Sequence, residues 1–320
     1  MRGTCVILIA LVLTFILGSC NGGRQGERTL TIFHAGSLAV PVTELGEAFG
    51  KANPGVKVLT EAAGSLQSAR KITELDRKCD IMLSADYFVV SSMLIPEYAS
   101  WNIRFATNEM VIAYRPEAPF ADDINADNWP DILLKEDVIT GRSDPDADPC
   151  GYRTVFVAKL AEEYYGMAGL ADSLLDKDRK YIRPKEVDLV ALAEAGVIDY
   201  MFQYRSVAIQ HGFLYLELPD EINLSSPGMD DHYSTVSYMI PGETPGSRKE
   251  VRGSYISYSG TVLDGSPQKE LALRFFEFML GEEGKSIFRE AGQEPLDPVV
   301  ADDIITIPGV LWPYVQSMTE

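Results

Sequence analysis

The chain has little positive charge and little histidine. Its 320 residues include 28 lysines and arginines against 47 aspartates and glutamates, a formal net charge of −19, and only 3 histidines. Nucleic acids are held by clusters of Lys and Arg that release counterions, so this balance argues against DNA or RNA as a partner. The histidines (His34, His211 and His232) show no zinc-ligand spacing. The sequence also has no CxxC pair, P-loop, HExxH motif or Ser-centred nucleophile elbow, which excludes the enzymes that depend on them.

Cysteine is scarce as well, with 4 in the whole chain. Cys5 lies in the N-terminal apolar segment and Cys20 just after it, which leaves Cys79 and Cys150 for the rest of the protein. Two such cysteines can pair in an oxidising compartment but need not. Cys79 stands in RKCDIMLSAD, a sequence typical of a strand entering the core, so a buried free thiol is the alternative.

A long apolar run occurs only at the N-terminus. Arg2 precedes the segment 5–17 (CVILIALVLTFIL), which is shorter than the roughly 20 residues that span a bilayer. This pattern predicts a secretory signal peptide over residues 1–19. The residues before Cys20 resemble a lipoprotein signal box, in which the cysteine becomes the lipidated N-terminus; an ordinary cleaved signal is the alternative. Residues 20–28 would then be a lipidated cysteine and a polar tether, and the protein would be exported and lipid-anchored, facing the periplasm or the cell exterior.

Strand and helix patterns alternate along the remaining chain, in which apolar residues suffice for a large core. Strands are predicted over residues 29–33, 56–60, 80–83, 108–114, 138–141, 198–204 and 254–263. Helices are predicted over residues 40–51, 66–76, 148–165, 186–195 and 268–291. This order predicts an α/β fold with a parallel sheet covered by helices. Residues 241–252 are rich in Gly and Pro and predict an exposed hairpin or loop.

Three strand-to-helix turns contain small or capping residues: HAGS at 34–37, AAGS at 62–65 and DADPCG at 146–151. In a parallel sheet such turns lie beyond the carboxyl ends of the strands, where open α/β folds bind ligands. Helix starts offer unpaired N–H groups and the positive end of a dipole. Gly36 and Gly64 permit close backbone approach, and Ser37 and Ser65 add hydroxyl donors. The turns therefore predict a site for a small anion, although Ser and Asp before helices are also ordinary N-caps.

Six motifs follow one another from about residue 30 to residue 296: HAGSL, TEAAGS, SADY, DPCGYR, YRSVAIQHGF and GQEPL. Together they resemble the molybdate/tungstate-binding proteins of ABC transporters, in the branch common in archaea. The resemblance implies a type II periplasmic binding protein, in which two α/β lobes enclose a cleft and two crossing strands form the hinge. It implies a lobe 1 of residues 29–107 plus 255–320 and a lobe 2 of residues 108–254.

The resemblance also implies which residues bind the ligand. Ser37 and Ser65 match the two serines that hydrogen-bond the oxyanion from lobe 1, and Tyr204 matches the tyrosine that does so from lobe 2. The backbone N–H groups near Ala85 and Cys150 are implied as further donors. Without the resemblance, Tyr204 is interpretable as a core residue.

Asp148 and Glu186 resemble two carboxylates that, in the archaeal branch, complete an octahedron around the metal of the oxyanion. Each has a structural alternative, because Asp148 before Pro149 is a good N-cap and Glu186 fits a first-turn carboxylate. Two ionised carboxylates repel a dianion at short range. Hydrogen phosphate can avoid this by donating its own proton, and tungsten(VI) or molybdenum(VI) can accept the carboxylate oxygens as extra ligands, whereas sulfur in sulfate cannot. The pair is therefore expected to favour metalates by excluding other anions.

The implied function is that of a monomeric binding lipoprotein. It captures tungstate or molybdate and delivers it to an ABC permease driven by a cytoplasmic ATPase, with no cofactor, no catalytic residue and no membrane contact beyond the anchor. The alternatives are a receptor for phosphate or sulfate, a sensory or adhesive lipoprotein of the same fold, and an enzyme that uses Cys150, since a helix N-terminus can lower a thiol pKa. The residues do not choose between tungstate and molybdate, because the two ions have the same charge and nearly the same size.

Overall fold

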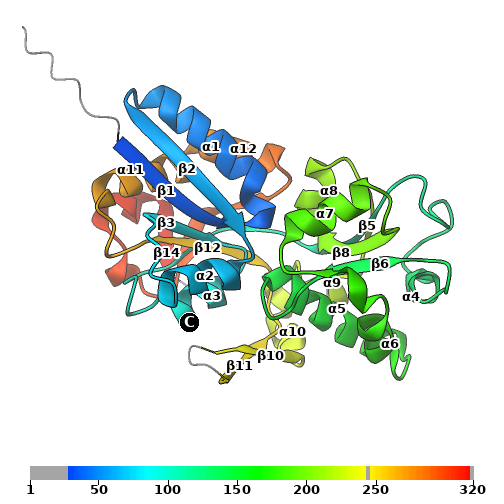
Figure 1. Cartoon of the computed structure of the whole chain (residues 1–320). Coiled ribbons are helices and arrows are strands. Elements are labelled where there is room, and N and C mark those ends of the chain that lie inside the picture. Colours follow the sequence, from blue (N-terminus) through cyan, green and yellow to red (C-terminus); the bar gives the residue numbers. More distant parts are fainter. Residues whose placement is uncertain (1–27, 243–245, 318–320) are drawn as a thin grey trace, which may run out of the picture.

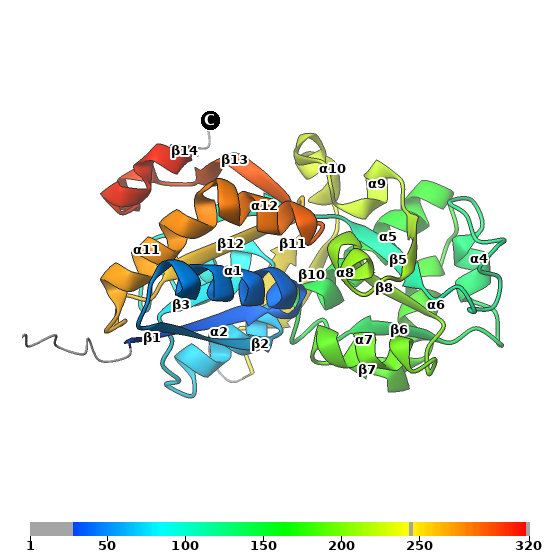
Figure 2. The same ribbon diagram turned by 90° about the horizontal axis from the view of Figure 1, so that it is seen from above.

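The computed structural model describes residues 28–242 and 246–317. The predicted signal peptide, the lipidated Cys20 and the tether up to residue 27 lie outside these residues. The described chain forms two α/β lobes that lie side by side, each around its own sheet (Figure 1). The view from above separates the same two bodies (Figure 2). The predicted α/β fold with two lobes is therefore confirmed.

Lobe 1 is built around the larger sheet. Its strands are β1 (Arg28–Ala35), β2 (Val56–Ala63), β3 (Ile81–Ser84), β4 (Ile103–Thr107), β12 (Ser257–Val262), β13 (Glu294–Ala301) and β14 (Val315–Ser317). In the described part of the chain they form seven strands in the order β14-β13-β4-β12-β3-β1-β2. β1 pairs in parallel with β2 and β3, as the predicted βαβαβ start requires. β12 runs antiparallel to β3 and β4, so the sheet is mixed rather than wholly parallel.

Helices cover both faces of this sheet (Figure 1). They are α1 (Ala39–Ala52), α2 (Ser65–Thr73), α3 (Tyr87–Met93), α11 (Lys269–Leu280) and α12 (Glu282–Glu290), with 3-10 turns η1 (Gly36–Leu38), η4 (Ile304–Thr306) and η5 (Gly309–Tyr314). On α1, Val42, Leu45 and Phe49 recur at helical spacing and are buried. The ring of Phe49 meets Phe275 of α11 edge-on, with centroids 5.2 Å apart. The amphipathic pattern of the sequence therefore faces the core as predicted.

The single helix predicted over residues 268–291 is wrong. The structure has two helices there, α11 and α12, separated at Gly281, whose extended backbone (ψ 175°) interrupts the helix. Gly284 then packs against the preceding turn, and a Cβ atom at this position would overlap the carbonyl oxygen of Met279. Leu280 and Ile287 stand seven residues apart, which is a helical spacing, and both pack in the core, so the apolar pattern continues across the break and conceals it.

Lobe 2 contains a smaller sheet. Its strands are β5 (Met110–Tyr114), β6 (Thr140–Ser143), β7 (Ile182–Arg183), β8 (Tyr200–Tyr204) and β9 (Leu214–Glu217). Among the described residues they form five strands in the order β7-β6-β8-β5-β9. The helical segments are α4 (Trp129–Leu133), α5 (Pro149–Tyr165), α6 (Leu170–Asp176), η2 (Arg179–Tyr181), α7 (Glu186–Glu194), α8 (Arg205–Gln210), α9 (Asp220–Asn223), η3 (Pro227–Met229) and α10 (Asp230–Tyr233). β6 is parallel to β7 and β8, so the loops after β6 and β8 emerge at the same edge of the sheet.

The chain passes between the lobes beside a buried polar residue. β4 ends at Thr107 in the larger sheet, and β5 begins at Met110 in the smaller one. Between them Asn108 donates hydrogen bonds to Ser206 of α8 (2.7 Å) and to Tyr258 of β12 (2.8 Å). Asn108 therefore links the connection to both lobes and fixes its course.

A hairpin confirms the prediction for the Gly- and Pro-rich segment. β10 (Ser237–Pro241) and β11 (Arg248–Arg252) pair antiparallel and extend from the main body (Figure 1). Arg248 of the hairpin forms an ion pair with Asp146 at 3.2 Å. No helix among residues 28–242 and 246–317 has the length and apolar character needed to cross a membrane.

Candidate functional site

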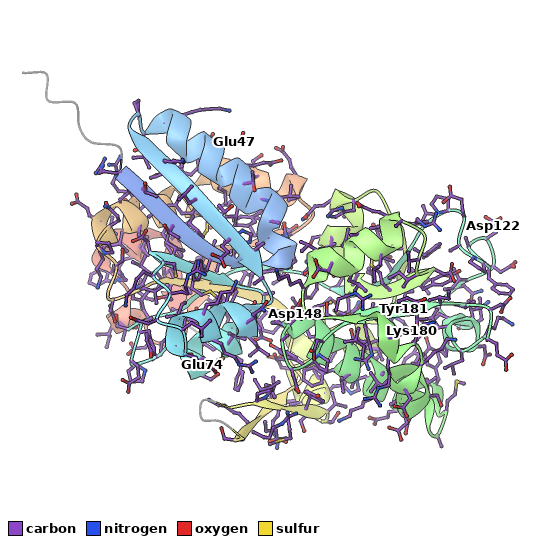
Figure 3. The ribbon with its side chains drawn as sticks, in the orientation of Figure 1. Glu47, Glu74, Asp122, Asp148, Lys180 and Tyr181 are labelled. Carbon is purple, nitrogen blue, oxygen red and sulfur yellow. The ribbon has the colours of Figure 1, made fainter. Side chains whose placement is uncertain are left out.

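The predicted turns meet where the two lobes face each other. Ser37 and Ser65 follow β1 and β2 in lobe 1, and Asp148 follows β6 in lobe 2. Tyr204 ends β8, the parallel neighbour of β6. Figure 3 shows Asp148 between the lobes. The carboxyl ends of the parallel strands thus bring these residues to one interlobe region, as open α/β folds do.

The two lobes are in direct contact at this region. The backbone N–H of Gln67 in lobe 1 donates to the carbonyl oxygen of Ala147 in lobe 2 at 3.3 Å. Arg70, also of lobe 1, donates to the carbonyl oxygen of Asp146 at 3.2 Å. At Gly64 the backbones approach so closely that a Cβ atom would lie 3.1 Å from Cβ of Asp148. The structure therefore has the lobes closed around the site.

Glu186 reaches the first turn of lobe 1. It is the first residue of α7 and only 3% exposed. A Cβ atom on Gly36 would lie 3.0 Å from Cβ of Glu186 and 3.4 Å from its Oε2, so glycine leaves room for this carboxylate. The nearby backbone N–H of Ser37 acts to lower the pKa of the Glu186 carboxyl group, against the larger opposing effect of burial. The structure therefore places Glu186 of lobe 2 against the loop that carries Ser37.

The three predicted hydroxyl groups can all donate hydrogen bonds to a ligand. The Oγ of Ser65 accepts the N–H of Ala85 at 3.0 Å, and the hydroxyl oxygen of Tyr204 accepts Nη1 of Arg153 at 2.8 Å. Since their oxygens already accept hydrogen bonds, their protons are available for another acceptor. The Oγ of Ser37 is buried with no hydrogen-bond partner among the described residues. A ligand rich in acceptor oxygens would satisfy these groups.

Asp148 uses one carboxylate oxygen for structure and leaves the other unpaired. It is the N-cap of α5, and its Oδ1 accepts the N–H of Cys150 at 3.1 Å. Its Oδ2 is buried and has no hydrogen-bond partner in the described chain. Buried polar atoms are nearly always paired, so an unpaired one points to a missing partner. Asp148 is therefore both the predicted N-cap and a free acceptor at the site.

The predicted backbone donors are used within the protein. The N–H of Ala85 donates to Ser65, and the N–H of Cys150 donates to Asp148. Both groups therefore position the side chains that surround the site in this closed structure.

Burial raises the pKa of both carboxyl groups. The pKa of Asp148 is raised to about 6 because burial outweighs the opposing hydrogen bond from Cys150. The pKa of Glu186 is raised well above its usual value, first by burial and then by repulsion from Asp148. The two groups thus interact, and holding both ionised in the closed protein costs free energy unless a ligand compensates them.

Burial disfavours the charged forms of Cys150 and His34. Burial raises the pKa of the Cys150 thiol, and the charges of Asp148 and Glu186 raise it further, so the thiolate is disfavoured. Burial lowers the pKa of His34 to about 4, and Nδ1 lies 2.8 Å from the carbonyl oxygen of Ala35. His34 thus contacts the backbone of its own turn. Cys79 and Cys150 are both buried and free, so no disulfide joins them.

Arg153 and Asp86 were not identified from the sequence. Arg153 of α5 is 2% exposed and pairs with Asp86 across the lobes at 2.8 Å. One signal could have revealed it: Arg153 is the only charged residue in the stretch PCGYRTVFVA, and a charge in an apolar helix is rarely buried without a partner. Gln293 of the GQEPL motif was also missed; its Nε2 donates to the carbonyl oxygen of Ser37 at 2.9 Å.

Asp148 and Glu186 do not form a conventional metal site. Within the part of the chain that the structure describes, no group of three or more His, Cys, Asp or Glu residues could hold a metal ion. A metal bound through the two carboxylates would have to bring most of its own ligands with it.

The sequence profile of the bacterial extracellular solute-binding proteins matches residues 30–294, and the chain belongs to this family. It is 41% identical to the molybdate/tungstate-binding protein WtpA of Thermococcus kodakarensis, over 93% of this chain and 92% of that protein. It is 42% identical to the protein of the same name from Pyrococcus abyssi, over 92% and 94%. An uncharacterised solute-binding protein of Petrotoga mobilis is 42% identical over 96% of both chains.

Solved structures share the fold at low sequence identity. The periplasmic molybdate-binding protein of Azotobacter vinelandii superposes with a TM-score of 0.60 at 16% identity, covering 82% of this chain and 98% of that one. The sulfate-binding protein SubI of Mycobacterium tuberculosis gives a TM-score of 0.60 at 13% identity, covering 91% and 94%. The fold is thus that of a type II periplasmic binding protein, as the sequence motifs predicted.

Proposed function

We propose that this protein is an exported, lipid-anchored receptor that captures tungstate or molybdate and delivers it to an ABC permease with a cytoplasmic ATPase. The observation that carries the proposal is the pair of buried carboxylates, Asp148 and Glu186, beside hydroxyl donors from both lobes. The names of the relatives from Thermococcus kodakarensis and Pyrococcus abyssi support the same ligands.

The hydroxyl donors favour an anion, and the carboxylates restrict which one. Ser37, Ser65 and Tyr204 offer protons to ligand oxygens. Two ionised carboxylates next to sulfate would repel it, and sulfur in sulfate cannot accept their oxygens as additional ligands. Tungsten(VI) and molybdenum(VI) can accept carboxylate oxygens as additional ligands, and this attraction would outweigh the repulsion. Asp148 Oδ2, which has no hydrogen-bond partner among residues 28–242 and 246–317, is the oxygen available for this role.

The size of the ligand supports coordination over hydrogen bonding alone. A metalate has about five heavy atoms, and at roughly −1.5 kcal/mol per atom these give about −7.5 kcal/mol. That corresponds to about micromolar affinity. Tighter capture of a scarce anion requires bonding between the carboxylates and the metal, together with closure of the lobes.

Calorimetric titration of a protein that begins after Cys20 tests the ligand. Tungstate, molybdate, sulfate and phosphate are titrated into wild type, Asp148→Asn and Glu186→Gln; Asn preserves the N-cap of α5. Asp172→Asn and Asp188→Asn, at exposed positions in the same lobe, are the controls. We expect wild type to bind tungstate or molybdate but not sulfate. This binding should be weakened at least tenfold in Asp148→Asn and Glu186→Gln and stay unchanged in the two controls. A preference for phosphate or sulfate, or a metalate affinity that neither substitution changes, would contradict the proposed ligand.

Delivery and anchoring are tested in cells. Deletion of the gene should impair growth on limiting tungstate or molybdate, and the loss should be reversed by excess metalate. Cys20→Ser should abolish incorporation of a labelled fatty acid and release the protein from the membrane fraction. Normal growth of the deletion strain, or membrane retention of the Cys20→Ser protein, would contradict these parts of the proposal. Turnover of a small ester or thiol that disappears in Cys150→Ala would instead support an enzyme.

A further inference from the structure

Arg153 connects three groups of the interlobe region. Its Nη1 donates to the hydroxyl oxygen of Tyr204 at 2.8 Å and to the carbonyl oxygen of Ala85 at 2.6 Å. Its Nη2 donates to Oδ2 of Asp86 at 2.8 Å. Tyr152 adds a further hydrogen bond, from its hydroxyl to the same Oδ2 at 2.7 Å. The guanidinium is therefore held by both lobes at once.

The contacts of Arg153 divide between the lobes. Arg153 on α5 and Tyr204 at the end of β8 belong to lobe 2. Ala85 and Asp86 lie between β3 and α3 in lobe 1. Opening the lobes would break the contacts to Ala85 and Asp86 and leave the contact to Tyr204. The ion pair is thus a property of the closed arrangement.

The contact to Tyr204 determines what its hydroxyl can do. With Nη1 donating to the Tyr204 oxygen, the hydroxyl proton cannot point at Arg153 and is available to a ligand. On the other lobe, Ala85 is held at its oxygen by Arg153 and donates its N–H to Ser65. A single guanidinium therefore positions a donor hydroxyl in each lobe.

We infer that Arg153 and Asp86 form a closure latch, in which Arg153 is a positioning residue that aligns the Tyr204 and Ser65 hydroxyls with a bound oxyanion when the lobes meet. The inference rests on the proposed function only in requiring an anionic ligand that accepts hydrogen bonds. Lysine cannot replace Arg153, because an ammonium lacks the planar fork that reaches three acceptors in fixed directions.

Attraction of the anion by the charge of Arg153 is the competing explanation. The two explanations give opposite results for Asp86→Asn. If Arg153 acts by charge alone, removing the negative charge of Asp86 strengthens anion binding. If the pair is a latch, the same change weakens binding by speeding dissociation, because the closed state loses its ion pair. Asn keeps an oxygen for the N–H of Phe88, which Asp86 caps at 2.8 Å.

Stopped-flow measurement of association and dissociation rates tests the latch in the protein that begins after Cys20. The probe is whichever of tungstate, molybdate, sulfate and phosphate binds wild type most tightly. We expect Asp86→Asn and Arg153→Lys to dissociate at least tenfold faster, with association changed less than threefold. Asp176→Asn and Arg179→Lys, an exposed ion pair of the same lobe at 3.4 Å, are the matched controls.

A double-mutant cycle with Tyr204→Phe tests the positioning role. If Asp86 acts through Tyr204, the effect of Asp86→Asn shrinks at least threefold in the Tyr204→Phe background; independent effects would multiply. The melting temperatures of the ligand-free variants are measured alongside, because Arg153 and Tyr204 also contact each other within lobe 2. If either Asp86→Asn or Arg153→Lys has a clearly lower melting temperature than wild type, the other of these two variants is used in its place.

The outcomes separate the latch from the ligand. Tight binding of phosphate or sulfate, with faster dissociation in Asp86→Asn, overturns the proposal that the ligand is a metalate but supports the latch. Metalate binding with tighter or unchanged affinity in Asp86→Asn overturns the latch but supports the metalate. Absence of binding to all four anions overturns both.

Discussion

Gly64 of lobe 1 lies against the backbone of Ala147 in lobe 2, and a Cβ atom at Gly64 would overlap the Ala147 carbonyl oxygen. The neighbouring N–H of Gln67 donates to the same oxygen at 3.3 Å. The residue next to Ala147 is Asp148, so the contact lies immediately beside the candidate ligand oxygens. Closure of the lobes therefore depends on the absence of a side chain at position 64.

Gly64→Ala is expected to weaken ligand binding at least tenfold while leaving the ligand-free melting temperature nearly unchanged. The added methyl group meets a backbone atom that cannot rotate away, and only the closed form contains this contact. Gly36→Ala should act in the same direction but less strongly, since its Cβ would lie 3.0 Å from Cβ of Glu186. Titration calorimetry measures both. Gly265→Ala, where nothing lies within 4 Å, is the control; equal affinities in all three variants would contradict the prediction.

Glu186→Gln is expected to favour closure of the ligand-free protein at pH 8. Burial and the charge of Asp148 raise the pKa of Glu186 in the closed state, so closure costs free energy that begins above the ordinary Glu pKa and is complete above the raised one. The difference should vanish at low pH, where wild-type Glu186 is protonated. Small-angle scattering should give a smaller radius of gyration for the variant at pH 8, and Asp188→Asn should match wild type. A larger radius for Glu186→Gln would show that the carboxylate attracts the opposite lobe instead.

His34 is expected to make the protein less stable in acid. Burial lowers its pKa to about 4 from an unfolded value near 6.5, so the unfolded chain binds more protons between these limits. Its contribution to stability is therefore complete above about pH 6.5 and falls by up to about 3 kcal/mol toward pH 4. Asp148 changes in the opposite direction over the same range, so the measurement is the difference in unfolding free energy between wild type and His34→Gln. A difference that stays constant with pH would contradict the assignment.

The two thiols of the protein that begins after Cys20 are expected to be unreactive until it unfolds. Burial raises the pKa of Cys79 to about 12 and also raises the pKa of Cys150. A thiol reagent at pH 8 should detect no cysteine in the native protein and two in guanidinium without a reductant. Cys79→Ala and Cys150→Ala should each give one. Absence of reaction in guanidinium would reveal a disulfide, and rapid native reaction of Cys150 would revive the enzyme alternative.

The local pattern and spacing of apolar, Gly and Pro residues were enough to predict most of the helices and strands. Val42, Leu45 and Phe49 identified a core-facing helix, and the Gly- and Pro-rich segment identified the hairpin. The break at Gly281 could not be seen, because the apolar spacing on either side of it stays in phase. The antiparallel position of β12 between β3 and β4 could not be predicted either, because the periodicity of a sequence does not show which distant strands pair.

Only part of the site could be predicted from the residues themselves. Ser37 and Ser65 follow neighbouring parallel strands, so their meeting at one edge of the sheet could be predicted from topology. The approach of Glu186 to Gly36 depends on how far the lobes close, which no local pattern encodes, and the family resemblance implied only that Glu186 binds the ligand. Arg153 was missed because its partner, Asp86, lies far away in the sequence and across the interlobe region.

The division of groups between the lobes has an evolutionary consequence. Both carboxylates stand on lobe 2, whereas lobe 1 contributes Ser37, Ser65 and the backbone around Gly36 and Gly64. If the carboxylates choose the anion as proposed, a descendant protein could acquire a new ligand through substitutions in lobe 2 alone. Lobe 1 could then be inherited almost unchanged as a general holder of oxyanions.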